Sequence, residues 1–241
     1  MISSWDRPQA APPLVIAHRG ASSVYPENTI AAFEGAAELG ADAVELDVRR
    51  TADGTFAVHH DATLGDGRRL VDLAGDELPP HVPRLDGAID ACRGLAVNVE
   101  IKNWPADADW DPERRLAVAV TRQVTARDDA DRILVSCFDE ETITAVHRLA
   151  PGLRTALLTG PPIDASALAG LAAAGHVAVH PFDATVTGDF VAAAHDLGLA
   201  VNVWTVDDPD RMATLAGWGV DGICTNRPDV ARSVLDRTRD A

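Results

Sequence analysis

Cysteine is scarce in this chain, and its placement excludes two classes of small stabilised fold. The three cysteines, Cys92, Cys137 and Cys224, lie far apart and form no CxxC pair. A zinc ribbon or a disulfide framework needs closely spaced thiols, so both are excluded. Reduced thiols are typical of the cytosol, and we therefore expect a cytoplasmic protein.

The sequence also lacks the patterns that direct a chain into or across a membrane. Residues 1–20 contain no basic region followed by an apolar run of signal length. Nowhere do about 18 apolar residues follow one another, which is the length that a spanning helix needs. We therefore expect no stable association with a membrane. Flexibility is expected only at residues 1–11 and 237–241.

Positive charge is in short supply. The chain has 21 Lys and Arg against 37 Asp and Glu, which gives a formal net charge of -16. The resulting field repels nucleic-acid backbones and anionic lipids, so a nucleic-acid partner is not expected. A small anionic substrate could still bind where a metal ion and a few basic side chains reverse the potential locally, because nearby charges outweigh distant screened ones.

What the sequence does contain is a regular alternation of two kinds of segment. Short β-branched apolar runs alternate with Ala- and Leu-rich segments of helical period, which is typical of a parallel sheet wrapped in helices. The length of 241 residues is close to the roughly 250 of one (β/α)₈ barrel. We therefore predict an α/β fold, a (β/α)8 TIM barrel, as a single domain over residues 12–241 after a flexible segment 1–11. The predicted strands are 14–17, 42–48, 96–101, 132–136, 154–158, 176–180, 199–204 and 220–224, and the predicted helices are about 28–39, 86–92, 112–126, 140–149, 165–174, 188–197, 209–217 and 228–238.

A further strand-like run, residues 56–60, follows the strand 42–48 after Asp53 and Gly54, a strong hairpin signal. We predict a small β-ribbon above the carboxyl-terminal mouth of the barrel, which brings His60 back beside Asp47. Residues 61–85 are rich in Gly, Pro and Asp and are predicted to form a loop insertion over the same end.

Acidic and imidazole side chains gather where the first three strands end, which is the end that carries the reacting groups in such barrels. Glu45 and Asp47 are two residues apart on one predicted strand, so they project to the same face. Three carboxylates in one mouth repel one another by roughly 4 kcal/mol per pair at an effective dielectric of about 20. An all-oxygen set suits Mg²⁺ or Ca²⁺ better than zinc. The predicted site comprises His18, Arg19, Glu45, Asp47, His60, Glu100 and Lys102.

Each of these residues also has a plainer interpretation. An isolated acid at a strand end is more often a solvated charge, but Glu45, Asp47 and Glu100 interrupt runs that otherwise look buried on both faces. A lone histidine is more often structural, whereas two beside carboxylates favour proton transfer. Arg19 suits phosphate but could instead pair with Glu27. The remaining histidines are interpreted as packing or surface residues: His59, His81, His147, His176, His180 and His195.

With these residues placed, the chain resembles the glycerophosphodiester phosphodiesterase family. The resemblance rests on HRG, PENT, ELD, HHD and EIK in this order between residues 18 and 102, and on VNVWTVDDPD and GVDGICTNRPD near the end. It implies hydrolysis of a glycerophosphodiester to glycerol 3-phosphate and an alcohol, within lipid and glycerol metabolism. It also implies that Glu45, Asp47 and Glu100 hold one divalent cation, Mg²⁺ or Ca²⁺, and that His18 and His60 act as acid and base.

By the same resemblance, Arg19 and Lys102 contact the phosphate, and Trp204 matches an aromatic residue near the substrate, although a core tryptophan is an equal alternative. SCF at 136–138 and Cys224 depart from the usual pattern and are expected to lie away from the chemistry. The segment after HHD does not indicate which alcohol is released. The chain is expected to be a monomer or a homodimer.

The resemblance leaves the attacking group open between the glycerol 2-hydroxyl, which would give a cyclic phosphate that water later opens, and water itself. One alternative function is a phospholipase C-like lyase that stops at the cyclic phosphate. Such enzymes usually act at membranes, and the acidic composition argues against this. The other alternative is a noncatalytic barrel that binds a phosphorylated ligand. Loss of one histidine would indicate it, and both are present.

Overall fold

The computed structural model describes residue 5 and residues 11–239. Most of the predicted flexible segment 1–11, together with residues 240–241, lies outside the described residues. The division into that segment and one domain over 12–241 stays a prediction. Of the helices in the described part of the chain, none combines the length and the apolar composition that a membrane span requires.

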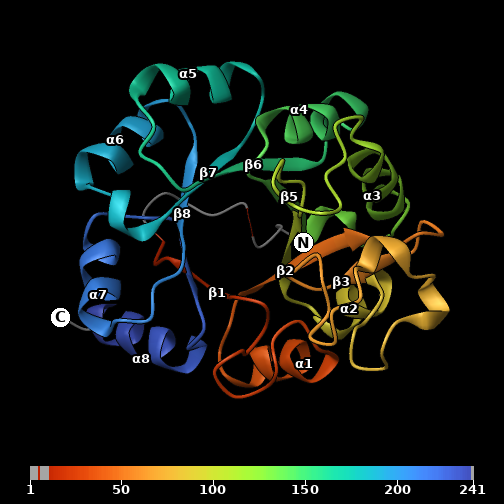
Figure 1. Ribbon diagram of the computed structural model, residues 1–241. Coiled ribbons are helices and arrows are strands. Elements are labelled where there is room, and N and C mark those ends of the chain that lie inside the picture. The colour runs from red at the N-terminus through yellow and green to blue at the C-terminus, as the bar shows by residue number, and fades with distance from the viewer. Residues whose placement is uncertain (1–4, 6–10, 240–241) are drawn as a thin grey trace.

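Eight parallel strands form a closed barrel, because the first strand pairs with both the second and the last (Figure 1). The predicted (β/α)8 TIM barrel is thus confirmed. A short additional strand, β3, extends the sheet antiparallel to β2. The strands are β1 (Leu14–Ala17), β2 (Ala43–Arg50), β3 (Phe56–Val58), β4 (Ala96–Ile101), β5 (Ile133–Cys137), β6 (Arg154–Thr159), β7 (Ala178–Pro181), β8 (Ala200–Val203) and β9 (Gly222–Thr225).

Helices surround the barrel and alternate with its strands (Figure 1). Several begin at a polar cap: the side chains of Thr29, Asp139, Asp164 and Asp208 each accept a hydrogen bond from a backbone N–H of the first helical turn. The α-helices are α1 (Ile30–Glu38), α2 (Leu85–Ala91), α3 (Arg115–Thr125), α4 (Glu140–Leu149), α5 (Ala165–Ala173), α6 (Gly188–Asp196), α7 (Pro209–Gly217) and α8 (Pro228–Arg239), and short 3₁₀ helices lie at Leu70–Asp72, Gly75–Glu77, Ala130–Arg132 and Asp183–Thr185.

The antiparallel pairing of β3 with β2 agrees with the hairpin predicted from Asp53 and Gly54. Arg49 pairs with Ala57, and the backbone N–H of His59 donates to the carbonyl of Asp47 at 3.0 Å. The chain therefore turns at the carboxyl end of β2 and runs back along β2 to the level of Asp47. This local pairing explains how a histidine far from β4 in the sequence reaches the same mouth.

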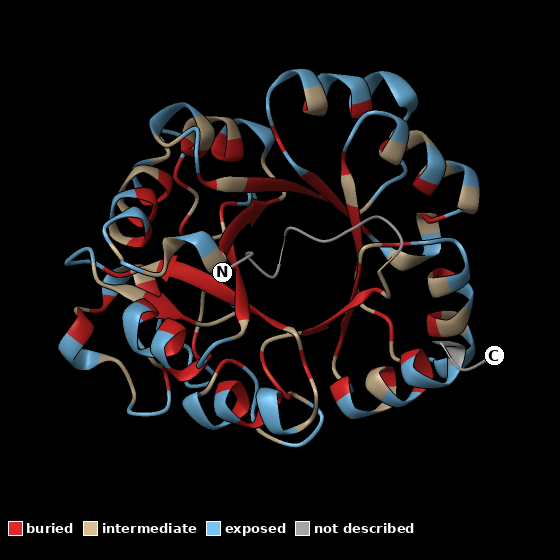
Figure 2. Ribbon diagram, turned by 180° about the vertical axis from the view of Figure 1, so that it is seen from behind, coloured by how far each residue is buried: buried red, intermediate tan, exposed pale blue. Residues whose placement is uncertain are grey.

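The strands are buried on both faces, and Figure 2 shows them as the buried centre of the molecule with exposed residues on the outer helices. In β2, Val44, Leu46 and Val48 join the main apolar cluster with residues of the surrounding helices. Because side chains alternate along a strand, Glu45 and Asp47 then point to the barrel interior. The same alternation turns Glu100 of β4 inward. The apolar shell thus fixes which side chains line the mouth.

Candidate active site

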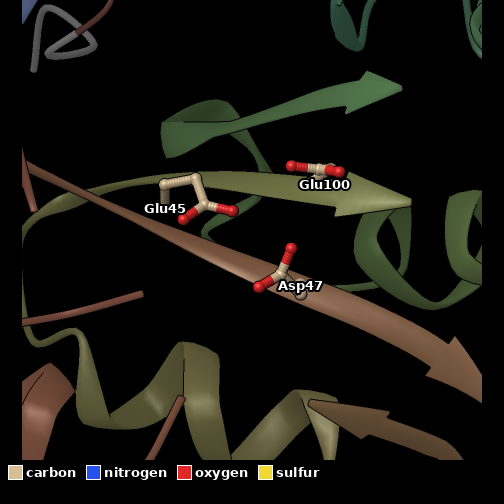
Figure 3. A group of neighbouring side chains, drawn as sticks. All are labelled: Glu45, Asp47 and Glu100. Carbon is tan, nitrogen blue, oxygen red and sulfur yellow. The ribbon is translucent and has the colours of Figure 1, made fainter. Parts of the chain in front are cut away.

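Three carboxylates meet inside the barrel, two from β2 and one from β4. Glu45, Asp47 and Glu100 are 4%, 1% and 8% exposed, and each offers an oxygen within 4.8 Å of the others. The backbone pairing of Asp47 with Glu100 on adjacent strands brings the two acids level with each other. Figure 3 shows the three side chains gathered over the two strands. Their predicted convergence is therefore present in the structure.

The positive charge around these acids does not balance them. The Lys102 Nζ atom lies 2.6 Å from Glu100 Oε1 and 3.3 Å from Asp47 Oδ1. The Arg19 Nε atom lies 3.5 Å from Asp47 Oδ2, but the same guanidinium pairs with Glu27 at 2.9 Å. One lysine and one shared arginine thus serve three buried carboxylates.

The pKa values express this deficit of positive charge. Burial raises the pKa of Glu45 well above its usual range, and the charges of Asp47 and Glu100 raise it further. Burial also acts to raise the pKa of Asp47, but Lys102 and Arg19 outweigh it and lower the pKa to about 2. The protein's own cations therefore hold Asp47 ionised and leave Glu45 tending toward the protonated form.

A divalent cation fits this donor set. The Oε1 atom of Glu45 is buried without a hydrogen-bond partner, and an orphaned carboxylate oxygen is costly unless something positive meets it. The three acids supply only oxygen donors, which suits a hard ion such as Mg²⁺ or Ca²⁺. The cluster of Glu45, Asp47 and Glu100 can therefore hold a metal ion.

The turn after β1 brings Arg19 to the acids. Arg19 and Gly20 both have left-handed backbone conformations, with φ of 57° and 80°. A Cβ atom on Gly20 would lie 2.6 Å from the backbone carbon of Ala32, so only glycine fits there. The turn lets the Arg19 backbone N–H donate to Glu45 Oε2 at 2.9 Å. The HRG sequence thus forms a tight turn after β1, and its glycine packs against α1.

His18 is held in one orientation by a chain of hydrogen bonds. Its Nδ1 atom lies 2.8 Å from Asn226 Oδ1, and the Asn226 amide nitrogen donates to Asp207 at 2.7 Å. Because Asp207 accepts from the amide nitrogen, Asn226 presents its oxygen to His18, and Nδ1 must carry the proton. The Nε2 atom of the neutral ring therefore has a free lone pair. Burial, followed by the charge of Arg19, lowers the pKa of His18.

His60 has the same tautomer but a charged partner. Its Nδ1 atom lies 2.7 Å from a carboxylate oxygen of Asp61, which can only accept in its ionised form. The Nε2 atom again faces away from this bond. Burial lowers the pKa of His60, while the negative charge of Asp47 acts in the opposite direction. Asp61 and Asn226 therefore play matching orienting roles, one charged and one neutral.

Two adjoining cavities open at the mouth. The inner cavity, about 200 Å³, lies inside the barrel and is lined by His18, Glu45, His60, Glu100 and Lys102, among others. The outer cavity, about 280 Å³, is lined mainly by loop residues, including Asp61, Trp104 and Asp107. His60, Glu100, Lys102 and Phe138 line both cavities. Both histidines and two of the three acids, Glu45 and Glu100, thus line one space.

Trp204 forms part of the opposite side of the inner cavity. Its indole N–H donates to the carbonyl of His180 at 2.8 Å, and its ring meets Phe138 edge to face at a centroid distance of 5.5 Å. It also packs on the apolar cluster at β1, so it both supports the barrel and lines the cavity. The two interpretations given for Trp204 are therefore compatible.

Several residues lie nearer the site than the sequence interpretation placed them. His180, interpreted as a packing or surface residue, is 3% exposed and lines the inner cavity. Phe138 and Cys224, expected to lie away from the chemistry, line the same cavity. Asn98 and Asn202 also line the inner cavity and were not singled out. Both asparagines interrupt apolar strands with the same period as the acids, a signal that could have identified them.

Known proteins resemble this chain in both sequence and fold. The sequence model described as the glycerophosphoryl diester phosphodiesterase family matches residues 18–230. A glycerophosphodiester phosphodiesterase from Caldanaerobacter subterraneus subsp. tengcongensis is 31% identical over 247 residues, which covers 90% of this chain and 95% of that protein. The crystal structure of a glycerophosphodiester phosphodiesterase from Parabacteroides distasonis is similar, with a TM-score of 0.84 and 27% identity, and covers 95% of this chain and 99% of that one.

A phosphodiesterase from Oleispira antarctica, solved in complex with the product sn-glycerol-3-phosphate, shares the fold with a TM-score of 0.84 at 23% identity, over 93% of this chain and 97% of that one. The family match begins at His18, the first residue of the site, and extends past Asn226 and the end of β9. Nearly the whole barrel therefore takes part in the similarity. From the sequence match, the relatives and the shared barrel, the chain belongs to the glycerophosphoryl diester phosphodiesterase family and is an enzyme.

Proposed function

We propose that this enzyme hydrolyses glycerophosphodiesters to sn-glycerol 3-phosphate and an alcohol, with one divalent cation and two catalytic histidines. The observation that carries the proposal is a cluster of three buried carboxylates, two of which line the inner cavity together with two oriented imidazoles, His18 and His60. Cleavage of a phosphodiester needs positive charge beside the phosphate and proton transfer at two oxygens. Both requirements have candidates within the inner cavity.

Glu45, Asp47 and Glu100 would hold the cation, which we propose to be Mg²⁺ or Ca²⁺ because all of the donors are oxygen atoms. When bound, the cation would offset negative charge on the nonbridging phosphate oxygens. Lys102 adds a fixed positive charge beside the acids. Burial acts to lower the pKa of Lys102, but Glu100 and Asp47 outweigh it and raise the pKa, so the ammonium group stays charged.

The two histidines would carry the protons. One Nε2 atom accepts the proton of the attacking oxygen as the new P–O bond forms. The other ring acts in its imidazolium form, with a proton on both nitrogens, and donates the Nε2 proton to the alcohol oxygen as the old P–O bond breaks, so the alcohol leaves without charge. Asn226 and Asp61 fix Nδ1–H on each ring, which keeps both Nε2 atoms available. Arg19 and Lys102 would contact the phosphate oxygens, and Trp204 the glycerol carbons.

The proposed setting follows from composition. A net charge of -16 disfavours nucleic acids and anionic membrane surfaces as partners, and the substrate would be a small molecule. Buried, unpaired cysteines suit a reducing compartment, so we propose a cytoplasmic enzyme. We also propose that it is a monomer or a homodimer, which light scattering after size-exclusion chromatography would measure.

A substrate panel tests the activity directly. Purified protein is incubated with several glycerophosphodiesters, and release of glycerol 3-phosphate is followed with a coupled dehydrogenase. We expect release that EDTA abolishes and that added Mg²⁺ or Ca²⁺ restores. Full turnover in EDTA would reject the metal. Absence of glycerol 3-phosphate with every diester and every metal would reject the activity.

A further inference from the structure

The outer cavity adjoins the point where the scissile bond would lie. His60, Glu100, Lys102 and Phe138 line both cavities, so the two spaces adjoin at these four side chains. A diester with its phosphate at this shared boundary would extend one substituent into each cavity. The alcohol that leaves and the glycerol that stays are therefore bound in different surroundings.

The inner cavity suits the glycerol. Its lining comes mainly from barrel strands, and it includes the side chains of Asn98 and Asn202, whose Oδ1 atoms are buried without hydrogen-bond partners. Free carbonyl oxygens can accept hydrogen bonds from hydroxyl groups. The outer cavity is instead built from loops after β3 and β4, which include Asp61, Trp104 and Asp107. The variable alcohol would therefore lie in the outer cavity.

The outer cavity carries surplus negative charge, because its lining includes three acids, Asp61, Glu100 and Asp107, against two basic side chains, Arg49 and Lys102. Arg49 lines it, but its guanidinium pairs with Asp107 at 2.9 Å and with Asp109 at 2.7 Å. One arginine thus faces two carboxylates. Asp61 adds a further carboxylate, which pairs with His60 rather than with a permanent cation. A positively charged group in this space would meet a net attraction, and an additional anion would be repelled.

The same cavity presents aromatic surface. Trp104 is 49% exposed and contacts Phe138 edge to face, with ring centroids 5.7 Å apart. Both rings line the cavity. Aromatic rings beside acidic groups are the arrangement that binds quaternary ammonium ions, because the ring face attracts a cation that is only weakly hydrated.

We infer that the outer cavity binds a cationic head group, so that the enzyme prefers glycerophosphodiesters whose alcohol carries an ammonium group, above all a quaternary one. The inference rests on the proposed function, since it names the substrate class of the same site. Trp104 and Asp107 would determine this preference, while the inner cavity would accept the glycerol phosphate that all such substrates share.

An isosteric pair of substrates isolates the charge. Glycerophosphocholine is compared with glycerophospho-3,3-dimethylbutanol, in which a carbon atom replaces the quaternary nitrogen and the shape is kept. We expect kcat/KM for the choline diester to be about 10-fold higher, as a partly desolvated cation–π contact would give. Both rates are measured on the same preparation, so loss of folded protein cancels in their ratio.

Variants assign the preference to the cavity. Trp104→Ala and Asp107→Asn should each bring the ratio for the two substrates toward one, whereas Trp104→Phe should keep most of it. Trp218→Ala is the matched control, because Trp218 is also an exposed tryptophan, 37% exposed, and stacks on Arg211 away from both cavities. It should leave the ratio unchanged.

The outcomes separate the two proposals. Equal kcat/KM for the charged and uncharged diesters, or a ratio unaffected by both Trp104→Ala and Asp107→Asn, would overturn the head-group inference while the phosphodiesterase activity stands. No hydrolysis of any diester in the presence of Mg²⁺ or Ca²⁺ would overturn the proposed function and the inference together.

Discussion

The two sides of the inner cavity differ in charge although they belong to one barrel. The side built from β1 to β4 contributes Arg19, Glu45, Glu100 and Lys102. Among the described residues that line the other side, from Phe138 to Cys224, none carries a formal charge at neutral pH. The charged side suits a metal ion and a phosphate. The neutral side suits the hydroxyl groups and carbon atoms of the substrate.

Burial keeps the neutral side neutral. It lowers the pKa of His180 to about 3 and raises the pKa of the Cys224 thiol well above its usual range. On the charged side, burial alone would neutralise the acids in the same way, but Lys102 and Arg19 hold Asp47 ionised. Burial also raises the pKa of Glu45 and Glu100, so among the three acids only Asp47 escapes its effect, through one lysine and one arginine.

The largest expected effect comes from removing a carboxylate from the charged side of the inner cavity. Glu45→Gln should lower kcat/KM on the order of 10⁴-fold and weaken metal binding, because the proposed cation would contribute several kcal/mol to stabilising the transition state. Without metal, the variant should unfold at a temperature equal to or above that of the parent, since one buried carboxylate is removed from a repelling set. Calorimetric titration with Mn²⁺ and thermal unfolding measure both effects, and Glu38→Gln, at an exposed position, is the control.

Removing either histidine should cost less and leave the charged side intact. His18→Ala and His60→Ala should each lower kcat about 10³-fold, within the usual worth of a general acid or base, with the affinity for Mn²⁺ preserved. Steady-state kinetics and metal titration check this. His81→Ala is the matched control at an exposed site. A His60 variant with full turnover would exclude this ring from the mechanism.

The buried His180 on the neutral side should make the free energy of unfolding depend on pH. His180 has a folded pKa of about 3 against roughly 6.5 in the unfolded chain, so the unfolded state takes up the proton first as the pH falls. The contribution of the neutral His180 ring to the free energy of unfolding is fully present above about pH 6.5 and is lost progressively as the pH falls toward 3. Between pH 7 and 5 the parent should lose about 2 kcal/mol more unfolding free energy than His180→Gln.

Urea unfolding at the two pH values measures this difference. His81→Gln, at an exposed position, should behave like the parent. If the free energies of the parent and of His180→Gln fall in parallel, the ring is protonated in the folded protein and that side of the cavity is charged below neutral pH.

The smallest expected effect concerns Trp204. Trp204→Phe should keep the edge contact with Phe138 but lose the hydrogen bond to the His180 carbonyl. We expect kcat/KM to fall about 10-fold through KM, because the change alters the surface that would contact glycerol and not the charged side. Steady-state kinetics separate KM from kcat. A shift of the melting temperature without any change in KM would make Trp204 a packing residue only.

The barrel was predictable because its signals are local. Each strand carries a buried apolar run, and each helix carries its own spacing and often its own cap, so eight repeats of the same pattern leave few other folds. The acids were also predictable, since Glu45, Asp47 and Glu100 interrupt those runs with period two. The Asp53–Gly54 turn was enough to indicate that His60 returns to the mouth.

The roles of His180 and Asn226 could not be predicted, because their partners are distant in the sequence. His180 is held at the site by two hydrogen bonds. The Asn202 amide of β8 bonds to its ring, and the Trp204 indole donates to its backbone carbonyl. Asn226 orients His18 across 208 positions of the chain. Hydrogen bonds of this kind form only after the barrel closes between β1 and β9, so no local sequence pattern predicts them.

By itself, the sequence determined the order of strands and helices, the inward direction of the acids and the excess of negative charge, because alternation and composition are properties of neighbouring residues. The tertiary structure decided which side chains meet across the barrel, which histidine nitrogens are free and where the loops leave an outer cavity. These depend on distances between segments far apart in the chain, and only closure of the sheet sets those distances.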